Sequence, residues 1–240
     1  MNEPAYKRVL LKISGEALAG GTGFGLDAGT LTYIAEEVAA VHSLGVQVAI
    51  VVGGGNFLRG ETFSSGGSVE RSVADQMGMM GTVINGLAMQ SALEHQGVAC
   101  RVQSAISIDA VCEPFIRRRA IRHMEKGRVV VFVAGTGNPY FTTDSAAALR
   151  SLEMECDCLF KATKVDGVYD KDPNKHDDAV RYEEVTFEEA ISKRLKIMDQ
   201  AAFALCQENG LPVIVLDLHR KGGMALAVTG GKIGTLVHGG

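Results

Sequence analysis

The sequence lacks the features of secreted and membrane-spanning proteins. No stretch approaches the roughly 18 consecutive apolar residues of a membrane helix. The apolar run Val9–Ile13 is interrupted by Lys12 and is too short for a signal peptide. The five cysteines are odd in number and none lies in a Cys-x-x-Cys pair, which argues against a disulfide framework and against a cysteine metal site. We therefore expect a cytoplasmic protein.

Two common nucleotide-binding motifs are missing or incomplete. The sequence contains no G-x-x-x-x-G-K-[ST], so it is not a P-loop kinase. Gly135-Thr136-Gly137 begins like the dinucleotide-binding motif G-x-G-x-x-G, but Tyr140 takes the place of the third glycine. A surplus of positive charge is also missing, since the formal net charge is −4 at pH 7. Bulk electrostatic attraction to nucleic acid is therefore not expected.

Short apolar, β-branched runs alternate with helical patterns along most of the chain. Helical patterns span 28–44, 73–95, 144–154 and 199–209, and the last two begin with Asp144 and Asp199, which could cap them. The apolar runs predict strands at Arg8–Ile13, Val46–Val52, Val98–Gln103, Arg128–Ala134, Cys158–Lys161 and Val213–Asp217. This alternation predicts an α/β domain whose parallel sheet is covered on both faces. The Met-rich helix at 73–95 is expected to be buried or to form a subunit interface.

Glycine makes up 29 of the 240 residues, well above the typical share of roughly 7%, and much of it follows the predicted strands. The strand ends run into KISGE at 12–16, GGGN at 53–56, GTGNP at 135–139 and KATKVDG at 161–167. Ligands of open α/β sheets bind beyond the carboxyl ends of the strands, and backbone N–H groups in glycine turns bind phosphate. With Lys12 and Arg59 adding positive charge, a phosphate-rich ligand is expected.

These segments resemble the amino acid kinase superfamily and, within it, the bacterial uridylate kinase family. Lys12–Glu16 and Gly53–Gly60 are similar to the superfamily pattern. GTGNPYFTTDSA at 135–146, DQMGM at 75–79 and KATKVDGVY at 161–169, followed by Asp172-Pro173, are similar to uridylate kinases in particular. The resemblance runs from about Tyr6 to Val237 and so covers nearly the whole chain.

The resemblance implies a single domain, 1–240, with the three-layer αβα sandwich and mainly parallel central sheet of the amino acid kinase fold. The N-terminal lobe, about 1–155, would bind UMP, and the C-terminal lobe, about 156–240, would bind ATP. The implied reaction transfers the γ-phosphoryl group of ATP to UMP, giving UDP and ADP for pyrimidine nucleotide (UTP and CTP) biosynthesis. The resemblance also implies a homohexamer.

Carried over residue by residue, the resemblance implies three sets of binding residues. UMP would contact Gly54, Asp75, Thr136, Gly137, Asn138, Pro139, Tyr140, Phe141, Thr142 and Thr143. The phosphates of ATP would face Lys12, Ile13, Ser14, Gly15, Gly55 and Arg59. The adenosine end of ATP would contact Thr163, Tyr169 and Asp172.

Phosphoryl transfer between two anions depends on alignment and on neutralised charge, which suggests four candidate catalytic residues. Lys12 would bridge donor and acceptor phosphoryl oxygens, and Arg59 would be a second cationic clamp. Asp144 would orient Lys12 or a water bound to Mg²⁺, and Asp199 is a candidate either for a similar role or for a helix N-cap. The Mg²⁺ cofactor would be held mainly by ATP phosphates and water. No general base is needed, because the UMP phosphate is a nucleophile at neutral pH.

Two alternatives remain open at this point. One is a kinase of another small acceptor, such as an amino acid carboxylate or carbamate, against which the GTGNPYFTTD segment argues. The other is a non-catalytic uridine-nucleotide sensor, against which the retained Lys12, Arg59 and Asp144 argue.

The resemblance implies regulation by two nucleotides, of which we expect one and leave the other open. UTP inhibition needs only the UMP site and is expected. GTP activation is left open, because Gln90 and Glu94 stand where several relatives have basic residues.

Overall fold

A computed structural model describes residues 3–58 and 68–240. Within them, nine strands form one sheet in the order β4-β3-β5-β2-β1-β6-β8-β9-β7. Neighbouring strands are parallel except β8 with β9. The strands are β1 Arg8–Ile13, β2 Gln47–Val52, β3 Cys100–Ser104, β4 Glu113–Pro114, β5 Val129–Val133, β6 Cys158–Thr163, β7 Glu184–Thr186, β8 Val213–Asp217 and β9 Thr235–His238. The mainly parallel sheet predicted from the sequence is confirmed.

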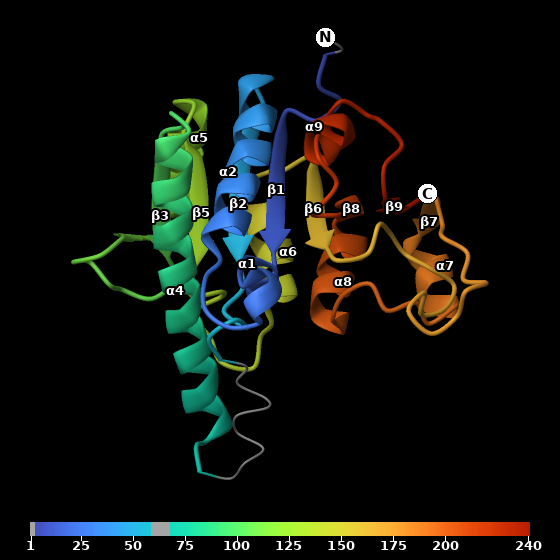
Figure 1. Cartoon of the computed structure of the whole chain (residues 1–240), viewed down its shortest axis with the longest axis horizontal. Helices are drawn as coiled ribbons and strands as arrows, with labels where there is room; N and C mark the ends of the chain where they lie inside the picture. Colours follow the sequence, from blue (N-terminus) through green and yellow to red (C-terminus); the bar gives the residue numbers. More distant parts are fainter. Residues whose placement is uncertain (1–2, 59–67) are drawn as a thin grey trace.

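Helices cover both faces of this sheet (Figure 1). Residues of α1, α2, α4 and α9 belong to the hydrophobic core on one face, and residues of α5, α6, α7 and α8 belong to the core on the other. The helices are α1 Gly15–Leu18, the 3-10 turn η1 Gly20–Thr22, α2 Ala28–Ser43, α4 Arg71–His95, α5 Arg117–Glu125, α6 Thr143–Glu153, α7 Phe187–Ser192, α8 Gln200–Glu208 and α9 Gly223–Val228. None of the described helices is long and apolar enough to cross a membrane.

Alternation along the central strands decides which side chains face which helices. In β1, Leu11 and Ile13 lie in the core with α2, whereas Leu10 lies in the core with α6. In β6, Phe160 lies in the first core and Leu159 in the second. Successive strand residues point to opposite faces, so the two lysines of these strands, Lys12 and Lys161, both point toward α6.

Helix α4 is packed tightly against the sheet on its inner side. A Cβ atom added at Gly86 would lie 2.2 Å from Cγ1 of Val133, so only glycine allows α4 to approach β5 this closely. The outer side of α4 exposes a row of apolar side chains. Val73, Met77, Met80 and Ile84 are between 40% and 48% exposed, which agrees with a helix that is apolar on more than one side.

The six predicted strands are confirmed as β1, β2, β3, β5, β6 and β8, and the four predicted helices as α2, α4, α6 and α8. The sequence did not predict β4, β7 and β9, which have two, three and four residues and lie toward the ends of the sheet. Such short segments carry too few residues for a periodic pattern.

Only one of the two predicted aspartate caps is correct. Asp199 caps α8, where its carboxylate accepts a hydrogen bond from Ala202 N at 3.0 Å. The N-cap of α6 is instead Thr142, whose hydroxyl accepts from Asp144 N at 3.1 Å and from Ser145 N at 3.2 Å. Asp144 lies in the first turn of α6, so its carboxylate can contact side chains from β1 and β6.

Candidate active site

Four neighbouring parallel strands, in the order β5, β2, β1 and β6, end at one edge of the sheet, the lower edge in Figure 1. The turns after β5 and β2, helix α4 and Lys12 of β1 surround a cavity of about 570 Å³, here called the first cavity. Its lining includes Lys12, Gly54, Gly55, Arg71, Asp75, Thr82, Thr136, Asn138, Phe141, Thr142, Thr143 and Asp144. The predicted convergence of the glycine-rich strand ends is therefore present in the fold.

A second cavity of about 610 Å³ lies beyond the end of β6. Its lining includes Lys161, Thr163, Gly167, Val168, Tyr169, Asp172, Lys196 and Ile197. Tyr169 lies on the long loop between β6 and β7, where its hydroxyl donates to Asp166 Oδ1 at 2.6 Å. The two cavities thus lie on either side of the central pair of strands, β1 and β6.

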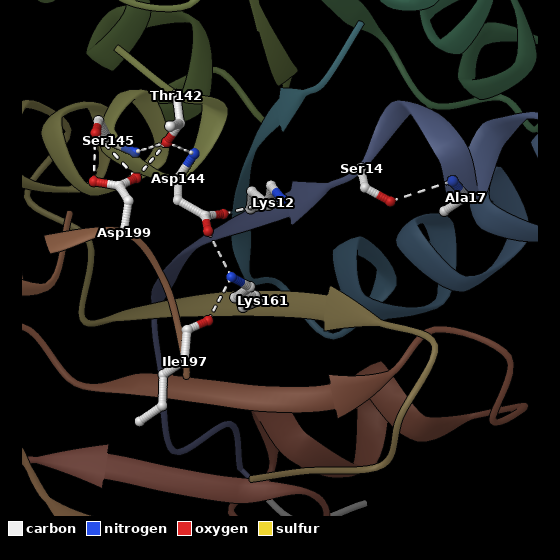
Figure 2. A network of polar contacts seen from close by, with 9 residues as sticks. All are labelled: Lys12, Ser14, Ala17, Thr142, Asp144, Ser145, Lys161, Ile197 and Asp199. Carbon is white, nitrogen blue, oxygen red and sulfur yellow. Dashed lines mark hydrogen bonds and ion pairs between the residues drawn. The ribbon is translucent and has the colours of Figure 1, made fainter. Parts of the chain in front are cut away.

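One buried carboxylate joins the two cavities by pairing with two lysines (Figure 2). The Nζ atom of Lys12 lies 3.0 Å from Asp144 Oδ1, and the Nζ atom of Lys161 lies 2.6 Å from Asp144 Oδ2. Lys161 also donates to the carbonyl oxygen of Ile197 at 2.6 Å. The side chains of all three charged residues are between 12% and 16% exposed, so the ion pairs are largely shielded from water.

The register of the sheet explains this arrangement. Lys12 in β1 is the direct partner of Lys161 in β6, so two ammonium groups emerge side by side on the same face. Burial raises the pKa of Asp144, but the charges of Lys12 and Lys161 outweigh it and hold that pKa below its usual range. Burial lowers the pKa of Lys161, although Asp144 acts in the opposite direction. Asp144 therefore carries the negative charge that lets two lysines occupy one buried site.

Asp199 fixes the first turn of α6 from below (Figure 2). Its carboxylate accepts hydrogen bonds from the hydroxyls of Thr142 and Ser145, the latter at 3.0 Å, as well as from Ala202 N. This carboxylate therefore connects the N-terminal ends of α6 and α8. The geometry gives Asp199 the N-cap role, one of the two roles considered for it.

The turn after β2 is locked against α1 and α4. A Cβ atom at Gly15 would lie 2.5 Å from Asn56 Oδ1 and 2.6 Å from Gly55 N, and one at Gly54 would lie 2.3 Å from Gly78 O. The buried amide of Asn85 donates to Gly53 O at 2.6 Å and to Asn56 Oδ1 at 2.7 Å. These contacts hold the backbone of the Gly53–Asn56 turn in one position.

The turn after β5 contains several left-handed residues. Gly135 and Gly137 have φ values of +57° and +81°, and the non-glycine residues Ala134 and Tyr140 have +60° and +72°. Asp75 on α4 accepts a hydrogen bond from Tyr140 N at 2.8 Å and pairs with Arg71 Nε at 2.9 Å. Asp75 therefore lines the first cavity and at the same time supports the predicted UMP-binding turn.

Most of the predicted site residues gather around the two cavities. Ten line the first cavity: Lys12, Gly54, Gly55, Asp75, Thr136, Asn138, Phe141, Thr142, Thr143 and Asp144. Thr163, Tyr169 and Asp172 line the second.

The remaining predicted residues have other positions. Gly137, Pro139 and Tyr140 belong to the turn after β5 without lining either cavity. Ile13 is buried in the core, Ser14 caps α1, and Gly15 packs on the turn after β2. Arg59 lies outside the described residues.

Two residues of the site were not among the predicted ones. Lys161 was recognised only as part of a motif, and Arg71 not at all. A signal for Lys161 did exist, since it is a lysine inside an apolar run that also predicts a central strand. Arg71 gave a weaker signal, four residues before Asp75 on the same predicted helix.

Comparison with known proteins gives consistent results. The amino acid kinase family model matches residues 7–217. The chain is 57% identical over 236 residues to a uridylate kinase from Paramagnetospirillum magneticum, covering 98% of both proteins. It is 53% identical to a uridylate kinase from Dichelobacter nodosus, again over 98% of both. The crystal structure of UMP kinase from Bacillus anthracis is 37% identical and superimposes with a TM-score of 0.94, covering 97% of this chain and 96% of that one.

The shared carboxylate leads to a prediction about stability. Lys161→Met should lower the free energy of unfolding at pH 7 by about 1–3 kcal/mol, because Asp144 loses one of its two cations inside the protein. The loss should stay below the roughly 3–5 kcal/mol of a fully orphaned buried charge, since Lys12 remains. Urea unfolding measures it, with Lys164→Met, at an exposed lysine of the same segment, as the control.

The deficit should also depend on pH. In the unmodified chain the pKa of Asp144 is lowered, so its contribution is complete above the ordinary aspartate pKa of about 3.9 and is lost as pH falls through the folded value. In Lys161→Met that pKa rises, so the deficit should shrink from pH 7 toward about pH 4. A deficit that is independent of pH would show that Asp144 does not depend on Lys161.

Proposed function

The chain belongs to the amino acid kinase family, and we propose that it is a UMP kinase, transferring the γ-phosphoryl group of ATP to UMP to give UDP and ADP. The observation that carries this proposal is the Asp144 carboxylate, paired with one lysine in the lining of each cavity. Two nucleotide sites with cations between them are what phosphoryl transfer between two anions requires. The names of the full-length relatives support UMP as the acceptor.

We propose that UMP occupies the first cavity, in an N-terminal lobe of about 1–155, and ATP the second, in a C-terminal lobe of about 156–240. The glycine turns after β2 and β5 offer backbone N–H groups to phosphate. Tyr169 and Asp172 line the cavity proposed for ATP. The transferred phosphoryl group then lies between the cavities, at the ends of β1 and β6.

Lys12 and Lys161 are the proposed cationic centre of the transfer. Their ammonium groups, one on each side of Asp144, can neutralise charge that builds up on the acceptor and donor phosphates. Arg59 is proposed as a further clamp on the phosphates, because a guanidinium can bind two phosphate oxygens at once. Asp144 acts through the lysines: its carboxylate fixes both ammonium groups at the end of the sheet. Asp199 fixes Asp144 in turn, through Thr142 and Ser145.

Mg²⁺ is the proposed cofactor, and it fits these residues best as an ion held by ATP. The described residues contain no cluster of three His, Cys, Asp or Glu side chains that could hold a metal, and both oxygens of Asp144 face lysines. ATP phosphates and water would supply most of the ligands, with Asp144 as the carboxylate that would hold one of those waters. When bound, the ion neutralises charge on the β- and γ-phosphates.

Three further properties belong to the proposal. A cytoplasmic location fits the five free cysteines, since reducing compartments keep thiols unpaired. A role in pyrimidine nucleotide biosynthesis follows from UDP as the product. A homohexamer is proposed because α4 exposes the apolar row Val73, Met77, Met80 and Ile84, whose spacing of four, three and four residues forms one helix face suited to a second copy.

An acceptor screen tests the proposed reaction. ADP release should be fast with UMP and much slower with CMP, dTMP and acetylglutamate. Lys12→Ala should lower kcat at least about 100-fold, as expected when one preorganised charge is removed from a transition state. Lys7→Ala, at the opposite end of β1 and exposed, is the control and should leave turnover unchanged. Preference for another acceptor would show a different kinase, and UMP binding without ADP release would show a sensor.

The oligomer has its own test. Ile84→Asp places a charge in the apolar row, so the particle mass measured by light scattering should fall from a hexamer to a smaller species. Ile191→Asp alters an isoleucine of similar exposure on α7, 54% against 48% for Ile84, and should leave the mass unchanged. A hexamer that survives Ile84→Asp would remove this face of α4 from the subunit contacts.

Regulation by nucleotides is proposed in two parts. UTP should inhibit competitively with UMP, because both present a uridine to the first cavity. The second part is activation by GTP. Near the end of α4, Gln90 donates to Glu94 Oε1 at 2.9 Å, and Arg101 lies 4.0 Å from Glu94. The acidic side chain of Glu94 should weaken the binding of a triphosphate there. Initial rates against UTP and GTP concentration, at several UMP concentrations, measure both effects.

A further inference from the structure

The hydroxyl of Thr82, on the inner side of α4, makes two hydrogen bonds to the backbone, one as acceptor and one as donor. Its Oγ1 atom accepts from Ala134 N at 2.6 Å and donates to Met79 O at 2.6 Å. The residue is 6% exposed. Ala134 is the first residue after β5 and the start of the proposed UMP-binding turn.

Ala134 needs such support because of its backbone conformation. It is fully buried and has a φ of +60°, a left-handed conformation that is unfavourable for residues with a Cβ atom. A buried N–H group also requires a partner. The other left-handed non-glycine residue of this turn, Tyr140, has its N–H bonded to Asp75. Both supporting side chains come from α4, seven residues apart on the same side of the helix.

Thr235 has the same arrangement at the other nucleotide cavity. In β9, its Oγ1 atom accepts from Val168 N at 2.8 Å and donates to Tyr182 O at 2.5 Å. Thr235 is fully buried. A Cβ atom at Gly167 would lie 2.5 Å from this hydroxyl oxygen, so the hydroxyl lies directly against the Gly167–Tyr169 segment that lines the second cavity.

We propose that Thr82 and Thr235 are positioning residues, one for each nucleotide: Thr82 sets the turn that binds UMP, and Thr235 sets the segment that binds ATP. The inference rests on the proposed function for the identity of the two ligands. Each hydroxyl fixes a backbone N–H that would otherwise be buried without a partner, and each does so beside only one of the two cavities. The two threonines should therefore affect the two substrates separately.

Threonine-to-valine substitution is suited to testing this, because valine keeps the shape and removes the hydroxyl. In Thr82→Val, the KM for UMP should rise at least about 10-fold while the KM for ATP changes less than about 2-fold. In Thr235→Val, the KM for ATP should rise and that for UMP should stay. Thr82→Ser and Thr235→Ser keep the hydroxyl and should restore the affected KM, even where the melting temperature stays lowered. The two valine variants are matched controls for each other.

The outcomes separate this inference from the proposed function. Equal rises in both KM values, or lower melting temperatures with unchanged KM values, would mean that the threonines only stabilise the fold, and would overturn the proposal. If a valine variant does not fold, the alanine variant at that position, with UMP and ATP binding measured by calorimetry, decides the same question. If the unmodified chain binds both nucleotides without transferring phosphate, the proposed function fails while the calorimetric comparison of the variants still tests the threonines.

Discussion

The structure depends most on a single carboxylate that stands between two lysines. Lys12 and Lys161 are direct partners on adjacent parallel strands, and such strands lie only about 4.8 Å apart. Two buried ammonium groups at this spacing would repel each other and lose protons to escape burial. Asp144 prevents both effects, with its oxygens 3.0 Å and 2.6 Å from the two nitrogens. The cationic centre thus exists only because α6 begins where it does, one residue after Thr142.

Helix α4 is the second organising element, and it acts through polar contacts on one side. Asp75, Thr82 and Asn85 bond to Tyr140 N, Ala134 N and Gly53 O, which belong to the turns after β5 and β2. Gly78, on the same side, lies against Gly54. The opposite side of this helix carries the apolar row proposed as a subunit contact. A movement of α4 in an assembly would therefore be transmitted directly to the two turns proposed to bind nucleotides, because the bonded groups belong to one rigid helix.

The sequence predicted the central architecture well and the coupling between its parts poorly. Arg8–Ile13 and Val213–Asp217 were predicted to the residue, because short runs rich in apolar, β-branched residues mark buried parallel strands, even where a lysine interrupts the run as in Arg8–Ile13. The choice between Thr142 and Asp144 as the cap of α6 could not be predicted, since both residue types cap helices well. In the structure Thr142 caps the helix, and the carboxylate of Asp144 pairs instead with the two lysines that strand pairing brings together. Lys161 was missed for a related reason. Its role depends on Lys12, its partner on β1, and local sequence patterns do not give the order of strands in a sheet.

The glycine turns show why such long-range packing matters for the chemistry. At Gly15, Gly53 and Gly54, the space of a Cβ atom is already filled by backbone atoms within 2.9 Å. The start of α1, the turn after β2 and helix α4 are therefore packed directly against one another. Backbone N–H groups held in this way keep their direction before any ligand arrives. Binding then costs little ordering of the protein, and the dipoles need no reorganisation when charge moves between phosphates. The tight packing of glycine around the lysine–aspartate centre is therefore a condition for transfer as much as for folding, because it fixes the donors relative to the cations.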